Sequence, residues 1–358
     1  MNRYARWIPA VAVPALVVAG AIAVPAVASA APTLPEKSPA QVLAMVADAK
    51  GVSYSGTLEQ SSNLGLPQLP ASAASPHAAA SDSTAADLLQ LLSRTNRIRV
   101  YVDGETKQRV QVLDDLAERD VVRNGSTVWT WDSKGRKATK VTLPSKGAAT
   151  KSDSTVTPAS LAAKLIAAVQ PATQLSVSST ASIAGRDAYQ LTMTPKTAGT
   201  LVRDVVLSVD AKTGLPLQVR VDATGQKAAA VTVGFTAIDY GKPDAKLFDF
   251  SAPSGAKVTT KDLSQAKRPE GNHGAVPQGA DAARPSTVGT GWSTIAVLPA
   301  ASDDRSRGLQ SQKLFGQLTQ KVAGGSAVQT SLVSVLFADD GRVLVGAVPV
   351  SALQAAAG

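Results

Sequence analysis

The chain has 358 residues, of which 44% are hydrophobic and only 4% aromatic, and a formal net charge of +9 at pH 7. This composition allows a sizeable core of aliphatic side chains, and the charge favours attraction to an anionic envelope surface. It lacks the long Lys/Arg runs and interleaved aromatic residues of nucleic-acid-binding proteins, and the absence of cysteine excludes disulfides, Fe–S clusters, Cys-based zinc sites and an acylated-cysteine lipoprotein anchor.

The first 30 residues have the pattern of a secretory signal peptide. Arg3 and Arg6 form a basic segment, Ile8 to Val27 is apolar, and Ala28-Ser29-Ala30 is an A-x-A cleavage site. We therefore expect export, with cleavage after residue 30. Because the apolar run is long for a signal peptide, the alternative is an uncleaved N-terminal anchor, although three prolines in the segment argue against it.

A helix, a strand and an insertion follow. Ser38-Pro39 is a favourable helix start, with serine as cap and proline in the first turn, and Gly51 ends the predicted helix. Residues 52–60, "VSYSGTLEQ", alternate apolar with polar and predict a half-buried strand. The Ser-, Ala- and Pro-rich residues 61–83 predict a flexible insertion, and 85–93 a short helix.

Two series of strands come next. In the first, Asp103-Gly104 joins "RIRVYVD" to "KQRVQVL", Asn124-Gly125 divides "RDVVRNGSTVWTWD", and "RKATKVTL" continues the antiparallel meander. A polar linker at 145–156 leads to a helix that begins at Thr157-Pro158 and ends at Pro171. The second series consists of "TQLSVSS", "RDAYQLTMT", "RDVVLSVD", "LPLQVRVD" and "AAAVTVGFTAIDYG", and "DAKLFDFSAPSGAKV" closes the unit at Val258.

The rest of the chain predicts a linker and a small second unit. Residues 259–287 are rich in Pro, Gly, Ala and charge. After them we expect the strand "GWSTIAVL", a helix over 309–322, the strands "TSLVSVLF" and "RVLVGAV" and a terminal helix. The expected domains are a signal peptide at 1–30, a main domain at 31–258, the linker at 259–287 and a small C-terminal α/β domain at 288–358.

Strands joined by hairpin turns, with few helices, predict an α+β fold: a large antiparallel sheet with helices on one face. A parallel sheet is not expected, because parallel strands need long crossover connections.

The triplet Lys212-Thr213-Gly214 matches one signature of serine β-lactamases and penicillin-binding proteins. These enzymes need S-x-x-K, S-D-N and K-T-G in that order, but S-x-x-K occurs only after the triplet, as at Ser264 to Lys267, and no S-D-N occurs. The triplet is therefore interpreted as a hairpin tip, with turn roles for Asp210 and Gly214.

Other arrangements for chemistry are also weak. His77 and His273 fall in different predicted loops, which makes a poor triad or metal site. Paired acids such as Asp339-Asp340 are explained by turn chemistry, and Gly324-Gly325 lacks the Lys that completes a phosphate loop. We expect no catalysis, no cofactor and no metal; a secreted hydrolase remains a minor alternative.

The alternating strands predict a sheet with one apolar face. For any single residue the ordinary role is packing beneath helices, but the few predicted helices would not cover so wide a sheet, which leaves room for an apolar cavity. An acyl chain suits such a cavity, at about 0.8 kcal/mol per buried methylene. The candidate lining residues are Tyr54, Leu58, Val100, Val102, Val110, Val112, Trp129, Trp131, Leu191, Met193, Val219, Val221 and Phe235.

With "AGRDAYQLTMTPK", "VVLSVDAKTGLPLQVRV" and "DYGKPDAKLFDFSAPSGAKV" after the first helix and meander, the chain resembles the LolA/LolB lipoprotein-carrier superfamily over about residues 38–258. RseB-type envelope-stress regulators and the lipid carriers LppX and LprG are relatives within it. The resemblance implies an unclosed antiparallel β-barrel, with helices as a lid over an apolar cavity that binds lipid without catalysis. The insertion at 61–83 and the missing lipobox depart from the family pattern.

We therefore expect an exported, LolA-like carrier or binding protein whose partners are lipid or lipoprotein acyl chains. It would be peripheral to the membrane surface, or tethered if the N-terminal segment is not cleaved. The alternative is an RseB-like sensor that binds a membrane-bound anti-sigma factor or other regulatory or acceptor protein, because RseB-type members also carry a small C-terminal domain. No nucleic-acid partner is expected.

Overall fold

The computed structural model describes residues 34–49, 51–65, 95–114, 117–144, 170–264, 285–300 and 319–358. Several expectations lie outside these ranges. They are the signal segment, nearly all of the insertion at 61–83 and of the helix expected from Thr157 to Pro171, the short helix at 85–93, and most of the helix at 309–322.

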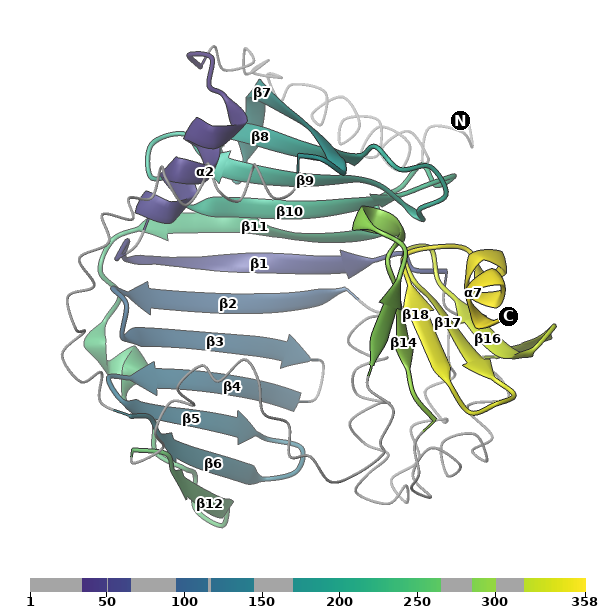
Figure 1. The fold of residues 1–358 in the computed structure, drawn as a ribbon. Coiled ribbons are helices and arrows are strands. Elements are labelled where there is room, and N and C mark those ends of the chain that lie inside the picture. Colours follow the sequence, from purple (N-terminus) through teal and green to yellow (C-terminus); the bar gives the residue numbers. More distant parts are fainter. Residues whose placement is uncertain are drawn as a thin grey trace, which may run out of the picture. The chain divides into compact units, whose positions relative to one another are not determined.

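The main feature is a 12-stranded sheet in the order β12-β6-β5-β4-β3-β2-β1-β11-β10-β9-β8-β7, drawn in Figure 1 as a curved sheet. The two edge strands, β7 and β12, are not paired with each other, so the sheet is unclosed. The strands are β1 Tyr54–Ser62, β2 Asn96–Asp103, β3 Lys107–Asp114, β4 Ala117–Asn124, β5 Thr127–Asp132, β6 Lys137–Thr142, β7 Thr173–Ile183, β8 Arg186–Pro195, β9 Val202–Asp210, β10 Pro216–Ala223, β11 Val231–Tyr240 and β12 Lys257–Asp262.

The expected large, mainly antiparallel sheet is thus confirmed, with one exception. β12 pairs in parallel with β6, with Lys257 opposite Lys137 and Asp262 opposite Thr142. The chain between β6 and β12, which includes β7 to β11 and the 3-10 helix η3 Ala245–Phe248, supplies the long connection that parallel pairing requires. The stretch expected to be linker from residue 259 is therefore still strand as far as Asp262.

Helix α2, Pro39–Asp48, begins as its sequence predicts. Ser38 and Gln41 form a capping box, in which each side chain accepts a hydrogen bond from the other residue's backbone N–H. The buried Val42 packs with Tyr189, Leu191 and Val209, so α2 covers one face of β8 and β9. Among the described residues, α2 is the helix that covers this sheet.

The β9–β10 turn packs against α2. Gly214 has a left-handed backbone with φ 72°, and a Cβ there would contact the carbonyl oxygen of Met45 and lie 2.7 Å from its carbonyl carbon. Gly225, in the next turn, has nearly the same φ of 78° but open space around it.

Gly214→Ala should therefore lower the free energy of unfolding more than Gly225→Ala does. The left-handed backbone costs about 1–2 kcal/mol in both variants, and overpacking against Met45 adds about 1–3 kcal/mol in the first alone. Urea unfolding of both variants measures the difference. An equal loss of stability in both variants would mean that close packing of the turn against Met45 of α2 does not contribute to stability.

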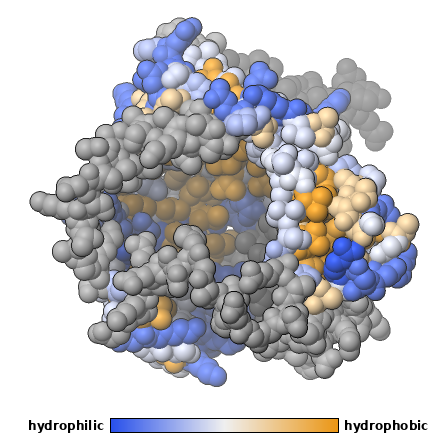
Figure 2. All heavy atoms as spheres, in the orientation of Figure 1, coloured by the Kyte–Doolittle hydropathy of each residue, from blue (hydrophilic) through white to orange (hydrophobic). Residues whose placement is uncertain are grey.

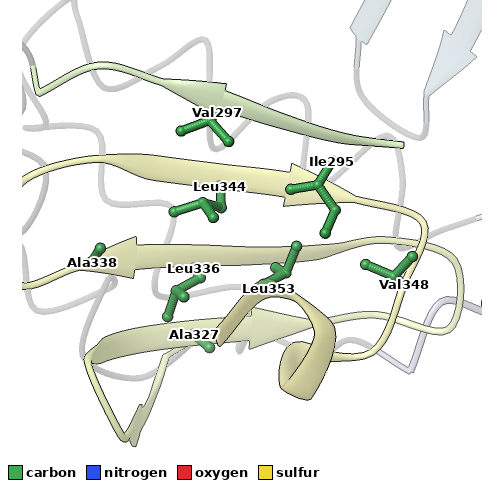
Figure 3. Packing of buried hydrophobic residues seen from close by; sticks show 8 residues of the cluster. All are labelled: Ile295, Val297, Ala327, Leu336, Ala338, Leu344, Val348 and Leu353. Carbon is green, nitrogen blue, oxygen red and sulfur yellow. The ribbon is translucent and has the colours of Figure 1, made fainter. Parts of the chain in front are cut away.

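The C-terminal part forms a second, 6-stranded sheet in the order β13-β14-β18-β17-β16-β15, with helix α7 Val350–Ala357. Leu336, Leu344 and Leu353 are fully buried at the centre of its core (Figure 3). A short 3-10 helix, η4 Gly291–Ser293, precedes β14. The strands are β13 Ser286–Val288, β14 Ile295–Leu298, β15 Gln320–Val322, β16 Gly325–Gln329, β17 Ser334–Ala338 and β18 Val343–Gly346.

The helix expected to run to Val322 is wrong at its end. Residues Gln320–Val322 are strand β15, and Val322 pairs with Gly325 across a tight turn. Leu314, Leu318 and Val322 have helical spacing, but the turn at Gly324, with φ 81°, and pairing with β16 decide the conformation of the last of them.

Hydrogen bonds join the second sheet to the large one. The carbonyl oxygen of Ala347 accepts from the backbone N–H of Leu201 and from the Thr200 hydroxyl, at 2.7 and 2.9 Å. The indole N–H of Trp292 donates to Thr173 Oγ1 at 2.8 Å. The C-terminal sheet is therefore in direct contact with the sheet that carries the candidate site.

Candidate functional site

The register of β1, β2 and β3 places the expected lining residues of these strands on one face of the large sheet. Tyr54 lies opposite Val102, and Val100 lies opposite both Gly56 and Val110. Side chains alternate between faces along a strand, so Leu58 and Val112 share this face. We call it the apolar face.

The apolar face continues across the centre of the sheet to β8. Gln60 on β1 pairs with Val233, Val233 with Val219, Val219 with Leu207, and Leu207 with Leu191. Val221 and Met193 follow by the same alternation. Figure 2 shows a hollow over the large sheet whose floor is coloured as hydrophobic.

Two aromatic rings lie on the apolar face where β1 and β11 meet. Tyr54 and Phe235 contact each other edge to face, with ring centroids 5.9 Å apart. A Cβ on Gly56 would lie 2.7 Å from the Phe235 ring, so the missing side chain makes room for it. Burial raises the pKa of the Tyr54 hydroxyl above its ordinary value of 10.0.

Trp129 and Trp131 do not share the apolar face, which corrects the expectation for these two residues. They alternate along β5 with Val128 and Thr130. Thr130 pairs with Val121, so Val128 and Thr130 lie on the apolar face and the two tryptophans lie on the other face. Trp129 packs against Phe250, with ring centroids 5.5 Å apart, on the opposite face. Alternation shows that the tryptophans share one face; the cross-strand register decides which one.

The two faces of β4 differ in how they are covered. On the opposite face, Val122 is 1% exposed beside the buried Phe248 of η3, and Arg109 forms an ion pair with Asp120 at 2.6 Å. The Arg109 guanidinium also donates to the Leu247 carbonyl oxygen at 3.3 Å. On the apolar face, Val121 is 44% exposed and, on β10, Val219 is 39% exposed.

Further residues of the apolar face were not among the candidates. Ile98 pairs with Leu58 and Val112, and Val121 pairs with Val110. Both could have been found by extending the two-residue alternation of their strands. Arg123, two residues from Val121, also lies on this face, and hydrophobic patterning gives no signal for it.

At the end of β9, the Lys212-Thr213-Gly214 triplet forms a turn around Asp210. The Asp210 carboxylate accepts hydrogen bonds from the backbone N–H groups of Lys212 and Thr213, each at 2.8 Å, and from Arg186 Nε at 2.8 Å. The Tyr240 hydroxyl donates to it at 3.2 Å and also lies 3.0 Å from Thr213 Oγ1. The turn interpretation is thus confirmed, although Thr213 is half-buried and bonded rather than exposed at the tip.

The ionisation of Asp210 follows from these contacts. Burial alone would raise the pKa of its carboxyl, but hydrogen bonds from Arg186, Thr213 and Lys212 outweigh burial and hold the pKa below its ordinary value of 3.8. Burial raises the pKa of Tyr240. Asp210 is therefore a charged structural centre, with its donors supplied by the fold.

The described part of the chain contains no group of three or more His, Cys, Asp or Glu side chains placed to hold a metal ion. His77, His273 and Lys267, which the sequence does not support as catalytic or metal-binding residues, lie outside the described ranges. At the acidic pair Asp339-Asp340, Asp340 accepts a hydrogen bond from the backbone N–H of Arg342, as a turn residue does. In the same ranges, none of the helices has the length and apolar character needed to cross a bilayer.

No family model matches this sequence. No curated protein matches it either. Among solved structures, MucB in complex with MucA(peri) is 17% identical, with a TM-score of 0.44 over 88% of this chain and 96% of that chain. The MucA/MucB complex of Pseudomonas aeruginosa is 18% identical, with a TM-score of 0.43 and the same coverage.

A LolA superfamily protein from Nitrosomonas europaea is 10% identical, with a TM-score of 0.25 over 60% of this chain and 99% of that one. The chain's own structure has the curved, unclosed, mainly antiparallel sheet that resemblance to the LolA/LolB superfamily implies.

Proposed function

We propose that this chain, whose fold is LolA-like, is an exported, non-catalytic binding protein that holds acyl chains of a lipid or lipoprotein on the apolar face. The contrast on β4 carries the proposal: Val121 is 44% exposed, whereas Val122, its neighbour on the other face, is 1% exposed. A continuous apolar surface that stays open in a folded chain is typical of a binding site. Apart from the Tyr54 and Phe235 rings, its apolar lining residues are aliphatic, which suits a methylene chain better than a polar ligand.

Native mass spectrometry tests this proposal. We expect protein purified without detergent to carry a bound lipid, and delipidated protein to take up a long-chain lipid in a one-to-one complex. A chain that neither retains nor takes up any lipid would overturn the proposal.

We further propose that the protein is released on the outer side of the membrane and remains peripheral to it. The basic and apolar N-terminal pattern and the net charge of +9 support this location. Mass spectrometry of the intact protein from its producing cells should show a mature chain that begins at Ala31. A full-length chain in the membrane fraction would point to a tethered form instead, and a full-length chain in the cytosol would contradict export.

A second candidate function is that of a sensor that binds a membrane-bound regulatory protein through the C-terminal sheet. The observation that favours it is the contact between this sheet and the large one, through Ala347 with Thr200 and Leu201. This contact would let a partner on one sheet influence ligand binding on the other. Pull-down of a membrane-bound regulator by the full chain, lost in a folded variant without residues 288–358, would favour a sensor over a carrier.

A further inference from the structure

Arg123 lies at the border of the apolar face. On β4 it is two residues from Val121 and therefore on the same face. Its cross-strand neighbours are Gln108 on β3 and Val128 on β5. The apolar face thus meets a cationic side chain one strand beyond Val110.

The guanidinium of Arg123 makes a hydrogen bond through one of its three nitrogen atoms in the described part of the chain. Its Nε donates to the carbonyl oxygen of Gly125 at 3.1 Å, and within the described ranges its two Nη atoms make no hydrogen bond. Within the described ranges, no carboxylate lies within ion-pair distance of it. Arg119, on the other side of Val121, is different because Asp132 lies opposite it on β5.

Helix α2 limits the part of the apolar face on which a chain can lie, because it packs on this face at β8 and β9 through Tyr189, Leu191 and Val209. From β10, which carries the exposed Val219, to β4, which carries Arg123, there are five strand spacings, or about 24 Å at ~4.8 Å each. A long acyl chain laid across these strands from Val219 would bring its polar end to β4, the strand that carries Arg123.

We infer that the ligand is an amphiphile with an anionic group, a carboxylate or a phosphate, and that Arg123 binds this group while the chain lies on the apolar face. The inference rests on the proposed function and adds the ligand's charge and orientation. A guanidinium binds a carboxylate or phosphate through paired N–H donors, and the adjoining apolar surface strengthens the bond by excluding water. A neutral lipid would gain nothing from Arg123.

The test compares three probes that share one oleoyl chain: oleoyl lysophosphatidic acid, oleate and neutral monoolein. Their affinities for the full chain are measured by titration, with wild type, Arg123→Gln and Arg99→Gln. Arg99 is an exposed arginine on β2 whose side chain lies on the opposite face, so its variant is the matched control. Thermal unfolding checks that both variants remain folded.

We expect wild type to bind at least one anionic probe more tightly than monoolein. Arg123→Gln should weaken that probe roughly tenfold, the equivalent of about 1.4 kcal/mol, and leave monoolein unchanged. Arg99→Gln should leave all three unchanged. The anionic probe that loses more affinity identifies the phosphate or the carboxylate as the natural group.

Two different failures are distinguishable. If wild type binds all three probes with equal affinity, or if Arg99→Gln weakens the anionic probes as much as Arg123→Gln does, this inference is overturned and the proposed function stands. If wild type binds none of the probes, the proposed function fails, and the inference fails with it.

Discussion

Asp210→Ala is expected to lower the free energy of unfolding by about 3–5 kcal/mol, because it removes one partner of a buried ion pair. The Asp210 side chain is 1% exposed and the Arg186 side chain 29% exposed, and their charged atoms lie 2.8 Å apart. The substitution also leaves the N–H groups of Lys212 and Thr213 without their acceptor. Urea unfolding at pH 7 measures the loss.

Asp187→Ala is the matched control, because Asp187 is an exposed carboxylate on the neighbouring strand β8. It should change stability by less than about 0.5 kcal/mol, as surface substitutions usually do. A similar loss in both variants would mean that Asp210 has no special structural role.

We expect the free energy of unfolding to depend on pH through the same carboxyl group. The pKa of Asp210 is lower in the folded chain than its ordinary value of 3.8, so its contribution is fully present above that value. This contribution to stability is lost as the pH falls from 3.8 to below the lowered pKa of the folded chain. The stability difference between wild type and Asp210→Asn should therefore be constant near neutral pH and shrink in acid; a difference that grows in acid would contradict this reasoning.

Val100→Asp should lower lipid binding at least tenfold with little effect on folding. Val100 lies near the middle of the apolar face, opposite Gly56 and Val110, and an aspartate there would face the bound chain without a partner. Burying an unpaired charge costs several kcal/mol, and the bound state would bear that cost. Lipid uptake measured by native mass spectrometry gives the loss.

Arg99→Asp is the control for this substitution, because it introduces the same residue at the adjacent position on the opposite face. Lipid uptake by this variant should match wild type. Equal loss in both variants would indicate that the ligand does not lie on the apolar face, or that neither variant folds; circular dichroism separates these outcomes.

The sequence by itself determined the features that depend on neighbouring residues. Ser38 and Pro39 predict the start of α2, and Gly104 and Gly125, with φ of 65° and 62°, predict two hairpins. The alternation of Val100 and Val102 with charged or polar neighbours predicts a sheet with one apolar face. Each of these follows from capping, turn chemistry or a two-residue period, which act within a few residues.

The tertiary structure decided which strands meet and which face is open. Trp129 and Val121 occupy opposite faces only because of the β4–β5 register, and Val322 is strand because β16 pairs with it. The parallel β12–β6 pair and the Arg186–Asp210 contact join residues far apart in the chain. Local periodicity cannot predict such contacts, because their free energy comes from pairing and burial between distant segments.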